Sequence, residues 1–176
     1  MRAQFWSFDV VFAMVIFGVA IVLLTFVWTG ISNQYSLSYG TGLVNLQAQL
    51  QSLQNRILGP GTPSNWNSAL DVSNTLTWSN VGIGLGTGNG TALSPNKVMT
   101  FMAMSNSAYQ ATKPLLGVGY DYYIVIYGSN IVLSLGASPY MSKATTTQVA
   151  MQSATLNSVP VRVQIMIWTN KTFGVS

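Results

Sequence analysis

The feature that most constrains this chain is a long apolar run over residues 10–28, in which Thr25 is the only plainly polar residue. At about 1.5 Å of rise per residue, a helix over this run nearly covers the ~30 Å hydrocarbon core of a bilayer. A cleavable secretory signal has a shorter apolar core of about 7–15 residues and a small-residue cleavage site, and residues 27–30 have no Ala-x-Ala pattern. The run therefore predicts a retained membrane-spanning helix.

Positive charge is placed asymmetrically around this run. Arg2 precedes it, and no Lys or Arg follows until Arg56. Because cytoplasmic flanks carry the excess of Lys and Arg, this bias predicts that the N-terminus lies inside the cell. The remaining chain is expected outside.

Asp9 lies at the edge of the apolar run. A carboxylate costs roughly 2.5–3.5 kcal/mol at the centre of a membrane helix and less near the interface. Two interpretations stay open. Asp9 is either an interfacial residue at headgroup level or a carboxylate that becomes paired when helices bundle, where the penalty for an unpaired charge would fix the axial register.

Charge-dependent chemistry is scarce throughout the sequence. Only 6% of the residues are charged, against about 25% in typical soluble domains, and there is no His, no Cys and no Glu. This composition excludes His- and Cys-based nucleophiles, the usual zinc ligand sets, haem and iron–sulfur ligation, and disulfides. We therefore expect no catalytic residue, no metal site, no cofactor and no enzymatic activity.

The net charge of +4 does not indicate nucleic-acid binding. The seven Lys and Arg residues stand singly along the chain, and none of them forms a cluster that could follow a phosphate backbone. The high isoelectric point reflects missing acids, so no nucleic-acid partner is expected.

The apolar run is predicted to continue into an amphipathic helix, so that one long helix covers residues 10–58. Gly30, Gly40 and Gly42 are candidate points for a kink, at about 1 kcal/mol each relative to Ala. Beyond them, a stripe at helical spacing predicts one buried face, and the sequence Gly-Pro-Gly at 59–61 ends the helix. The stripe consists of Leu43, Leu46, Leu50, Leu53 and Ile57.

Residues 62–176 are predicted to form a β-rich head, which makes the chain an α+β protein. One or two short strands are expected over 75–85, and one short helix from Pro95 to about Gln110 with Ser94 as its N-cap. The glycine-rich stretch 84–90 lacks the Lys-Ser/Thr of a phosphate loop and is interpreted as a turn. Four strands are expected over 120–127, 131–135, 145–151 and 159–168, as an antiparallel meander on the long helix.

The N-terminal residues carry a resemblance. The sequence Arg-Ala-Gln-Phe-Trp-Ser-Phe-Asp at positions 2–9, followed by a long apolar helix, resembles the leader of archaeal type IV pilin-like proteins with a class III signal peptide. In that family a prepilin peptidase cuts on the cytoplasmic side of the helix. The resemblance makes Arg2, Ala3, Gln4 and Phe5 the candidate processing residues, although Ala3 stands where Gly is usual and Asp9 where Glu is common.

Three states of the leader remain open. If the mature chain begins at Gln4, Asp9 is its sixth residue; if it begins at Phe5, Asp9 is the fifth, the position at which many type IV pilins carry an acid that complements a neighbour's N-terminal amine. In an uncut chain, Arg2 would be the natural cationic partner for Asp9 of another subunit. Residues 1–9 are accordingly treated as a leader segment.

The resemblance implies a filament subunit at the cell surface. Its helix would lie in the membrane before assembly and in the filament core afterwards, with the head as an outer sheath for surface adhesion. Implied partners are further copies of the chain, the prepilin peptidase, an assembly ATPase and a membrane platform. The alternative is a single-pass membrane-anchored envelope protein or minor pseudopilin. Candidate assembly residues are Asp9, Phe5, Trp6, Phe8, Phe12, Phe17 and Phe26.

Two Asn-x-Thr sequons begin at Asn89 and Asn170. Both fall on the side of the membrane predicted to be external, where N-glycosylation is possible. They are the candidate glycosylation sites of the head.

Overall fold

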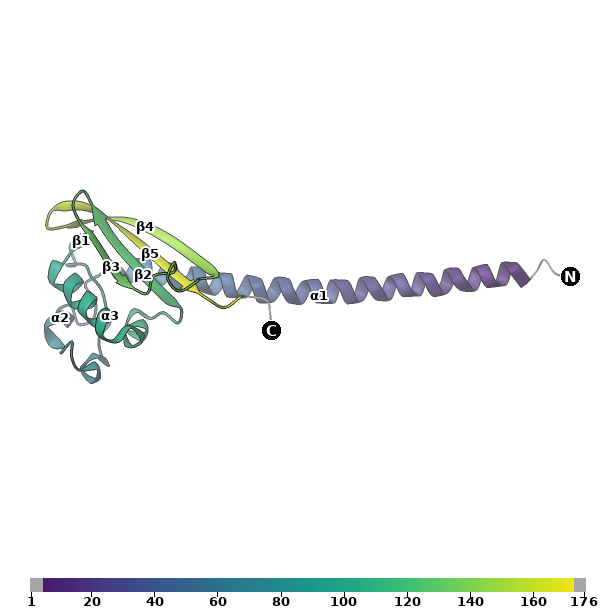
Figure 1. The fold of residues 1–176 in the computed structure, drawn as a ribbon, viewed down its shortest axis with the longest axis horizontal. Helices are drawn as coiled ribbons and strands as arrows, with labels where there is room; N and C mark the ends of the chain where they lie inside the picture. The colour runs from purple at the N-terminus through teal and green to yellow at the C-terminus, as the bar shows by residue number, and fades with distance from the viewer. Residues whose placement is uncertain (1–4, 173–176) are drawn as a thin grey trace. The chain divides into compact units, whose positions relative to one another are not determined.

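The computed structural model describes residues 5–172, and for residues 5–7 and 30–41 it describes the backbone alone. The chain divides into two compact units between Gly42 and Leu43, here called the N-terminal unit and the C-terminal unit, and each is described by itself. The fold is α+β, as predicted: an apolar N-terminal helix and a mixed sheet with further helices. The elements are α1 (Phe5–Ile57), α2 (Trp66–Ala69), η1 (Thr75–Trp78), β1 (Ala92–Leu93), α3 (Pro95–Leu116), β2 (Asp121–Gly128), β3 (Val132–Gly136), β4 (Thr146–Leu156) and β5 (Val159–Thr169) (Figure 1).

Helix α1 includes the whole of the predicted apolar run and ends within one residue of the predicted boundary. It remains helical through Gly30, Gly40 and Gly42, so none of the candidate kink positions interrupts it. In the C-terminal unit its last turns carry the predicted stripe: Leu46, Leu50, Leu53 and Ile57 are buried in the core, and Leu43 is half-buried. Helical spacing therefore identified the buried face correctly.

The sheet has the strand order β1-β4-β5-β2-β3, so the predicted meander is wrong. The hairpins β2–β3 and β4–β5 are joined through β2 and β5, and β1 runs parallel to β4 while the other pairings are antiparallel. The most apolar strand, β5, thereby gains a neighbour on each side, while the exposed Val132 and Ser134 stay on the edge strand β3. Burial of β5 explains why the chain does not pair its strands in sequence order.

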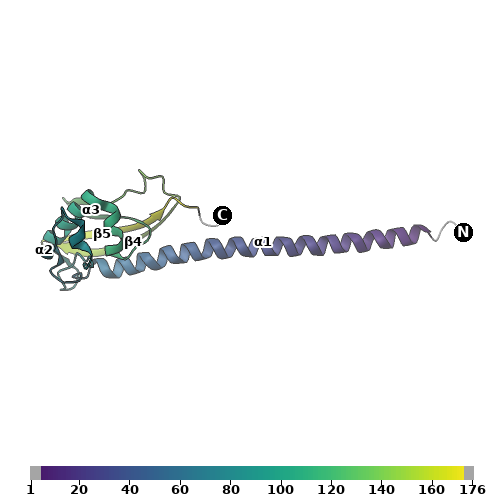
Figure 2. The ribbon, with the colours of Figure 1, turned by 90° about the horizontal axis from the view of Figure 1, so that it is seen from below.

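One face of the sheet builds the core of the C-terminal unit. The inward-facing residues of β5 are all buried, and three of them lie opposite buried residues of β2. Helix α3 packs against β3. Helix α2 lies against α3, as Figure 2 shows. The β5 residues on this face are Val161, Val163, Ile165 and Ile167, and those of β2 are Tyr122, Ile124 and Ile126.

Two local predictions need correction. Helix α3 begins at Pro95 as predicted but is not short: it bends at Ala108 and continues to Leu116, where Gly117 in the left-handed conformation ends it. Residues 75–85 contain the 3-10 helix η1 and only an isolated bridge between Thr62 and Gly82, not strands. Local hydrogen bonds explain the difference, because Asn74 Oδ1 accepts from Leu76 N and Trp78 Nε1 donates to Asp71 O.

Candidate functional site

The largest exposed apolar surface in the described chain is the first half of α1. An 18-residue stretch within Phe8–Thr29 has a mean hydropathy of 3.0, and none of that stretch is buried within the chain. By length and composition the helix can cross a membrane. Water would not tolerate so many bare apolar side chains, since each costs about 1.5–3 kcal/mol relative to burial. The segment therefore requires lipid or other protein around it.

The candidate aromatic residues of this segment lie on two opposite sides of the helix. Phe8, Phe12, Phe17 and Phe26 are each between 65% and 79% exposed. At 100° per residue, Phe8, Phe12 and Phe26 lie within about 40° of one another, and Phe17 lies on the opposite side. A partner on one side would cover only part of this surface. The arrangement suits surroundings that are apolar in every direction.

The two threonine hydroxyl groups of this segment form hydrogen bonds within the helix itself. Thr25 Oγ1 donates to Ile21 O at 2.8 Å, and Thr29 Oγ1 donates to Thr25 O at 2.9 Å. Such bonds to the preceding turn satisfy hydroxyl groups that would otherwise be costly in an apolar environment. Neither threonine requires a polar partner from outside the helix.

Asp9 is the exception on this surface. Its side chain is exposed on α1, and among the described residues it takes part in no ion pair. Arg2, Ala3 and Gln4 lie outside the described residues, and so do the side chains of Phe5 and Trp6. Among the described side chains of the N-terminal unit, the Asp9 carboxylate therefore has no cationic partner.

A buried lysine in the C-terminal unit was not predicted from the sequence. Lys97, in the first turn of α3, is 6% exposed, and its Nζ donates to Pro60 O at 2.7 Å and to Gly86 O at 2.9 Å. Burial lowers the pKa of this ammonium group. Pro60 lies just after the end of α1 and Gly86 lies in the glycine-rich stretch, so Lys97 ties these two segments together.

The glycine-rich stretch supplies the other half of this arrangement. Leu85 N donates to Ile57 O at 2.7 Å and Gly86 N to Gly59 O at 2.8 Å, so the stretch satisfies carbonyl groups at the end of α1 and just after it. A Cβ at Gly86 would lie 1.8 Å from Leu58 O. The glycine is therefore needed for close packing of backbone on backbone.

A polar cluster fastens α3 to β2. Lys113 Nζ lies 2.7 Å from Asp121 Oδ1, and Tyr109 OH donates to the same oxygen at 3.0 Å. Tyr109 also accepts from Tyr122 N at 3.0 Å. Burial, followed by the nearby Asp121 charge, raises the pKa of Tyr109, and burial raises the pKa of Tyr122. Both groups stay protonated and act as structural hydrogen-bonding groups.

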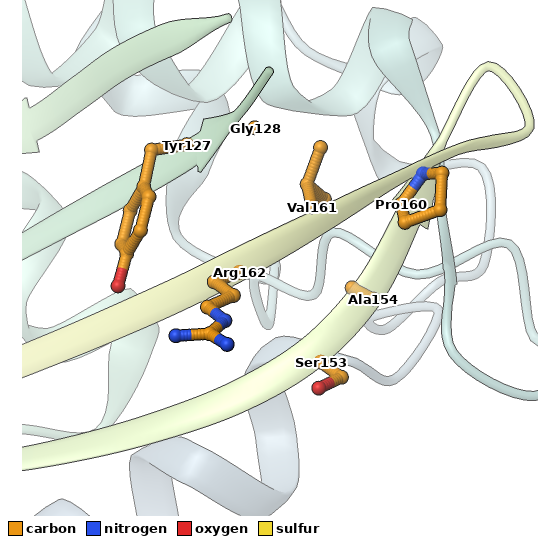
Figure 3. A pocket seen from close by; sticks show the side chains of 7 residues that line it. All are labelled: Tyr127, Gly128, Ser153, Ala154, Pro160, Val161 and Arg162. Carbon is orange, nitrogen blue, oxygen red and sulfur yellow. The ribbon is translucent and has the colours of Figure 1, made fainter.

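A shallow pocket of about 330 Å³ opens where β2, β4 and β5 come together (Figure 3). Tyr127, Ser153, Pro160 and Arg162 line it, with Gly128, Ala154 and Val161. The pocket contains no carboxylate or general base that could activate Ser153, so its lining suggests no reaction.

The two sequons lie on the surface of the C-terminal unit. Asn89 is exposed in the turn before β1, and Asn170 is exposed just after β5. Both side chains are therefore accessible to a modifying enzyme, and occupancy stays a prediction.

These features define an α+β protein whose N-terminal helix is long and apolar enough to serve as a membrane anchor or signal. In comparisons with known proteins, the chain matches no protein-family model, no curated protein and no solved structure.

Proposed function

We propose that this chain is a structural subunit of an archaeal type IV pilus-like extracellular filament. Its helix would be inserted in the cytoplasmic membrane before assembly, with the N-terminus inside, and would enter the filament core on polymerisation. The head, poor in charge, would form the outer sheath and contact surfaces. The proposal includes an assembly ATPase, a membrane platform and a prepilin peptidase as partners.

One observation carries the proposal: Phe8–Thr29 has no side chain packed within the chain, on any side of the helix. A bundle of identical helices can cover all sides of each member, whereas one partner cannot. The resemblance of residues 2–9 to a class III leader supports the same interpretation. Lipid tails are as apolar as the helix, so transfer into a filament must be driven by packing and polar pairing.

Asp9 supplies such a polar pairing. In a filament core its carboxylate would meet a cationic partner, either Arg2 or the N-terminal amine of a neighbouring subunit. An unpaired carboxylate in that environment is penalised, so the pair favours one axial register. Asp9 is therefore proposed as a register-setting residue for assembly.

The test is assembly by Asp9→Ala, expressed as the sole copy, with Asp71→Ala as the matched control on the exposed surface of the C-terminal unit. Sheared surface fractions are compared with membrane fractions. Asp9→Ala should reach the membrane at normal levels but yield few or irregular filaments, whereas Asp71→Ala should assemble normally. Normal filaments from Asp9→Ala would show that assembly does not need the Asp9 carboxylate.

The second candidate function is a single-pass envelope protein or minor pseudopilin, which the same exposed helix supports. Finding the wild-type protein solely as a membrane monomer after shearing would favour this candidate and overturn the filament. Intact mass analysis of the natural protein then distinguishes cleavage before Gln4, cleavage before Phe5 and an uncut chain.

A further inference from the structure

One edge of the sheet in the C-terminal unit is open along most of β4. Strand β1 pairs only with the last two residues of β4, through Ala92 with Thr155 and Leu93 with Leu156. No other strand of the described chain lies on that side of β4. Residues 146–154 therefore form a long edge segment, and β5 covers only its other side.

The direction of the free backbone groups follows from one hydrogen bond. Thr155 N donates to Thr91 O at 3.1 Å across this edge. Because outward-facing groups alternate along an antiparallel strand, the backbone groups of every second residue before Thr155 also point outward. These residues are Thr147, Val149, Met151 and Ser153, all exposed, and none of their backbone groups has a partner on that side within the described residues.

The usual protection of an edge strand is missing here. The unpaired backbone N–H and C=O groups of an edge strand can pair with a strand of another chain. Natural proteins prevent this pairing with Lys or Pro on the edge, with bulges or with short edge strands. Residues 146–154 contain no charged residue and no proline. The opposite edge is shorter: β3 has five residues, and its Gly136 N already donates to Ser105 Oγ.

We propose that the β4 edge is a docking surface for the β4 edge of a second copy of this chain. The two strands pair antiparallel about a two-fold axis at Ala150. In this register Thr147 lies opposite Ser153 of the second copy, and Val149 lies opposite Met151. Every outward-facing residue then meets an outward-facing residue, so the groups left free in one copy satisfy those in the other.

Side chains match on both faces of this joined sheet. On the outer face, Val149 and Met151, which are 49% and 54% exposed, cover each other's apolar surface. On the inner face, Gln152 lies opposite Gln148 of the second copy. Gln152 Oε1 is buried without a hydrogen-bond partner among the described residues. Turned toward the edge, this amide meets a donor from Gln148.

The proposed contact is closed by its two-fold symmetry, so it joins two copies and no more. It does not rest on filament formation. In a filament whose subunits all point the same way, a two-fold contact cannot repeat along one filament. It would join heads of two neighbouring filaments and hold them side by side.

The test uses the full chain in detergent, and the absence of cysteine makes single-cysteine variants unambiguous. Ala150→Cys puts two thiols across a non-hydrogen-bonded pair, where Cα atoms are about 4.5 Å apart and a disulfide can form. Mild oxidation should convert most of this variant to a covalent dimer. Val149→Cys is the register control, because its two thiols lie on a diagonal of about 7–8 Å.

A third variant measures random collision. Met141→Cys lies on a loop and is 89% exposed, so its dimer yield sets the background. A dimer yield from Ala150→Cys at or below that background overturns the proposal. A dimer yield from Val149→Cys equal to that from Ala150→Cys also overturns it. A disulfide formed only in a mixture of Ala150→Cys with Ser134→Cys would indicate β4–β3 pairing and also overturn it.

A charge on the edge provides the final check. Met151→Lys changes an exposed side chain, so circular dichroism should show a folded chain, while the Ala150→Cys dimer yield should fall at least tenfold. Unchanged dimer yield would contradict the edge contact. Because no step requires filaments, a failure of filament assembly leaves this result intact, and a failure here leaves the filament proposal intact.

Discussion

The Nζ of Lys97 lies 2.9 Å from Gly86 O, inside a unit where it meets no carboxylate among the described residues. The ammonium group is held by backbone carbonyl groups alone, at the point where the chain leaves α1. Burying a charge costs desolvation free energy, and the hydrogen bonds to the two carbonyl groups offset part of that cost. This contact helps to hold the segment after α1 to the glycine-rich stretch.

Lys97→Met should destabilise the C-terminal unit by about 2–4 kcal/mol, because Pro60 O and Gly86 O lose their donor in a buried place. Denaturant unfolding monitored by tryptophan fluorescence measures the change. The exposed Lys143→Met is the matched control and should change stability by less than about 0.5 kcal/mol. Equal stability of the two variants would contradict the role assigned to Lys97.

Gly86→Ala should cost more than about 3 kcal/mol or prevent folding, since its Cβ would lie 1.8 Å from Leu58 O. Gly90→Ala is the matched control in the same stretch: its φ is +63°, and nothing lies within 4 Å of the added Cβ. We expect only the left-handed backbone cost there, about 1–2 kcal/mol. Similar losses for both variants would rule out steric exclusion at Gly86.

The C-terminal unit should lose stability as pH rises above about 10. The pKa values of Tyr109 and Tyr122 are raised above their ordinary value of 10.0, so the unfolded chain releases these protons first. Lys97, whose pKa is lowered from 10.5, acts in the opposite direction and offsets part of this loss. Unfolding free energies at pH 8, 10 and 11 should therefore decline less steeply in Tyr122→Phe than in the wild type. Parallel declines would exclude this tyrosine as the cause.

Asp121→Asn should weaken the contact between α3 and β2 by about 0.5–1.5 kcal/mol. The effect is modest because the side chains of Lys113 and Asp121 are 16% and 27% exposed, and solvent screens the pair. High salt should reduce the difference from the wild type. Asp71→Asn, also at an exposed carboxylate, is expected to leave stability unchanged, and a comparable loss there would show a general effect of lost charge.

Periodic patterns made the helix and the core face predictable. The leucine stripe of α1 and the alternation in β5 each repeat over many residues, so burial on one side leaves a clear record in the sequence. Alternation does not describe the other face of β5, where Met166 and Trp168 are buried as well. Trp168 Nε1 donates to Ala137 O, a contact from a loop that periodicity does not describe.

Contacts between distant segments could not be predicted in this way. Strand order depends on which hairpins meet, and β2 and β5 are separated by β3, β4 and their connections. The burial of Lys97 could not be predicted from the sequence, because its partners are the backbone carbonyl groups of Pro60 and Gly86. Every residue has such a carbonyl group, so no residue type indicates the contact. The candidate residues of α1 rest on composition and resemblance, and their roles stay predictions.

The internal hydrogen bonds of Thr25 and Thr29 also bear on reversibility. Under the proposed function, the helix exchanges fatty acyl chains for protein neighbours without breaking or forming a single hydrogen bond at these hydroxyls. These two hydroxyl groups therefore add little to the activation barrier for extraction from lipid or for return to it, and Asp9 is the polar group whose pairing changes. The same subunit could be drawn from a membrane reservoir and given back to it, so filament length would follow the supply of work from the assembly motor.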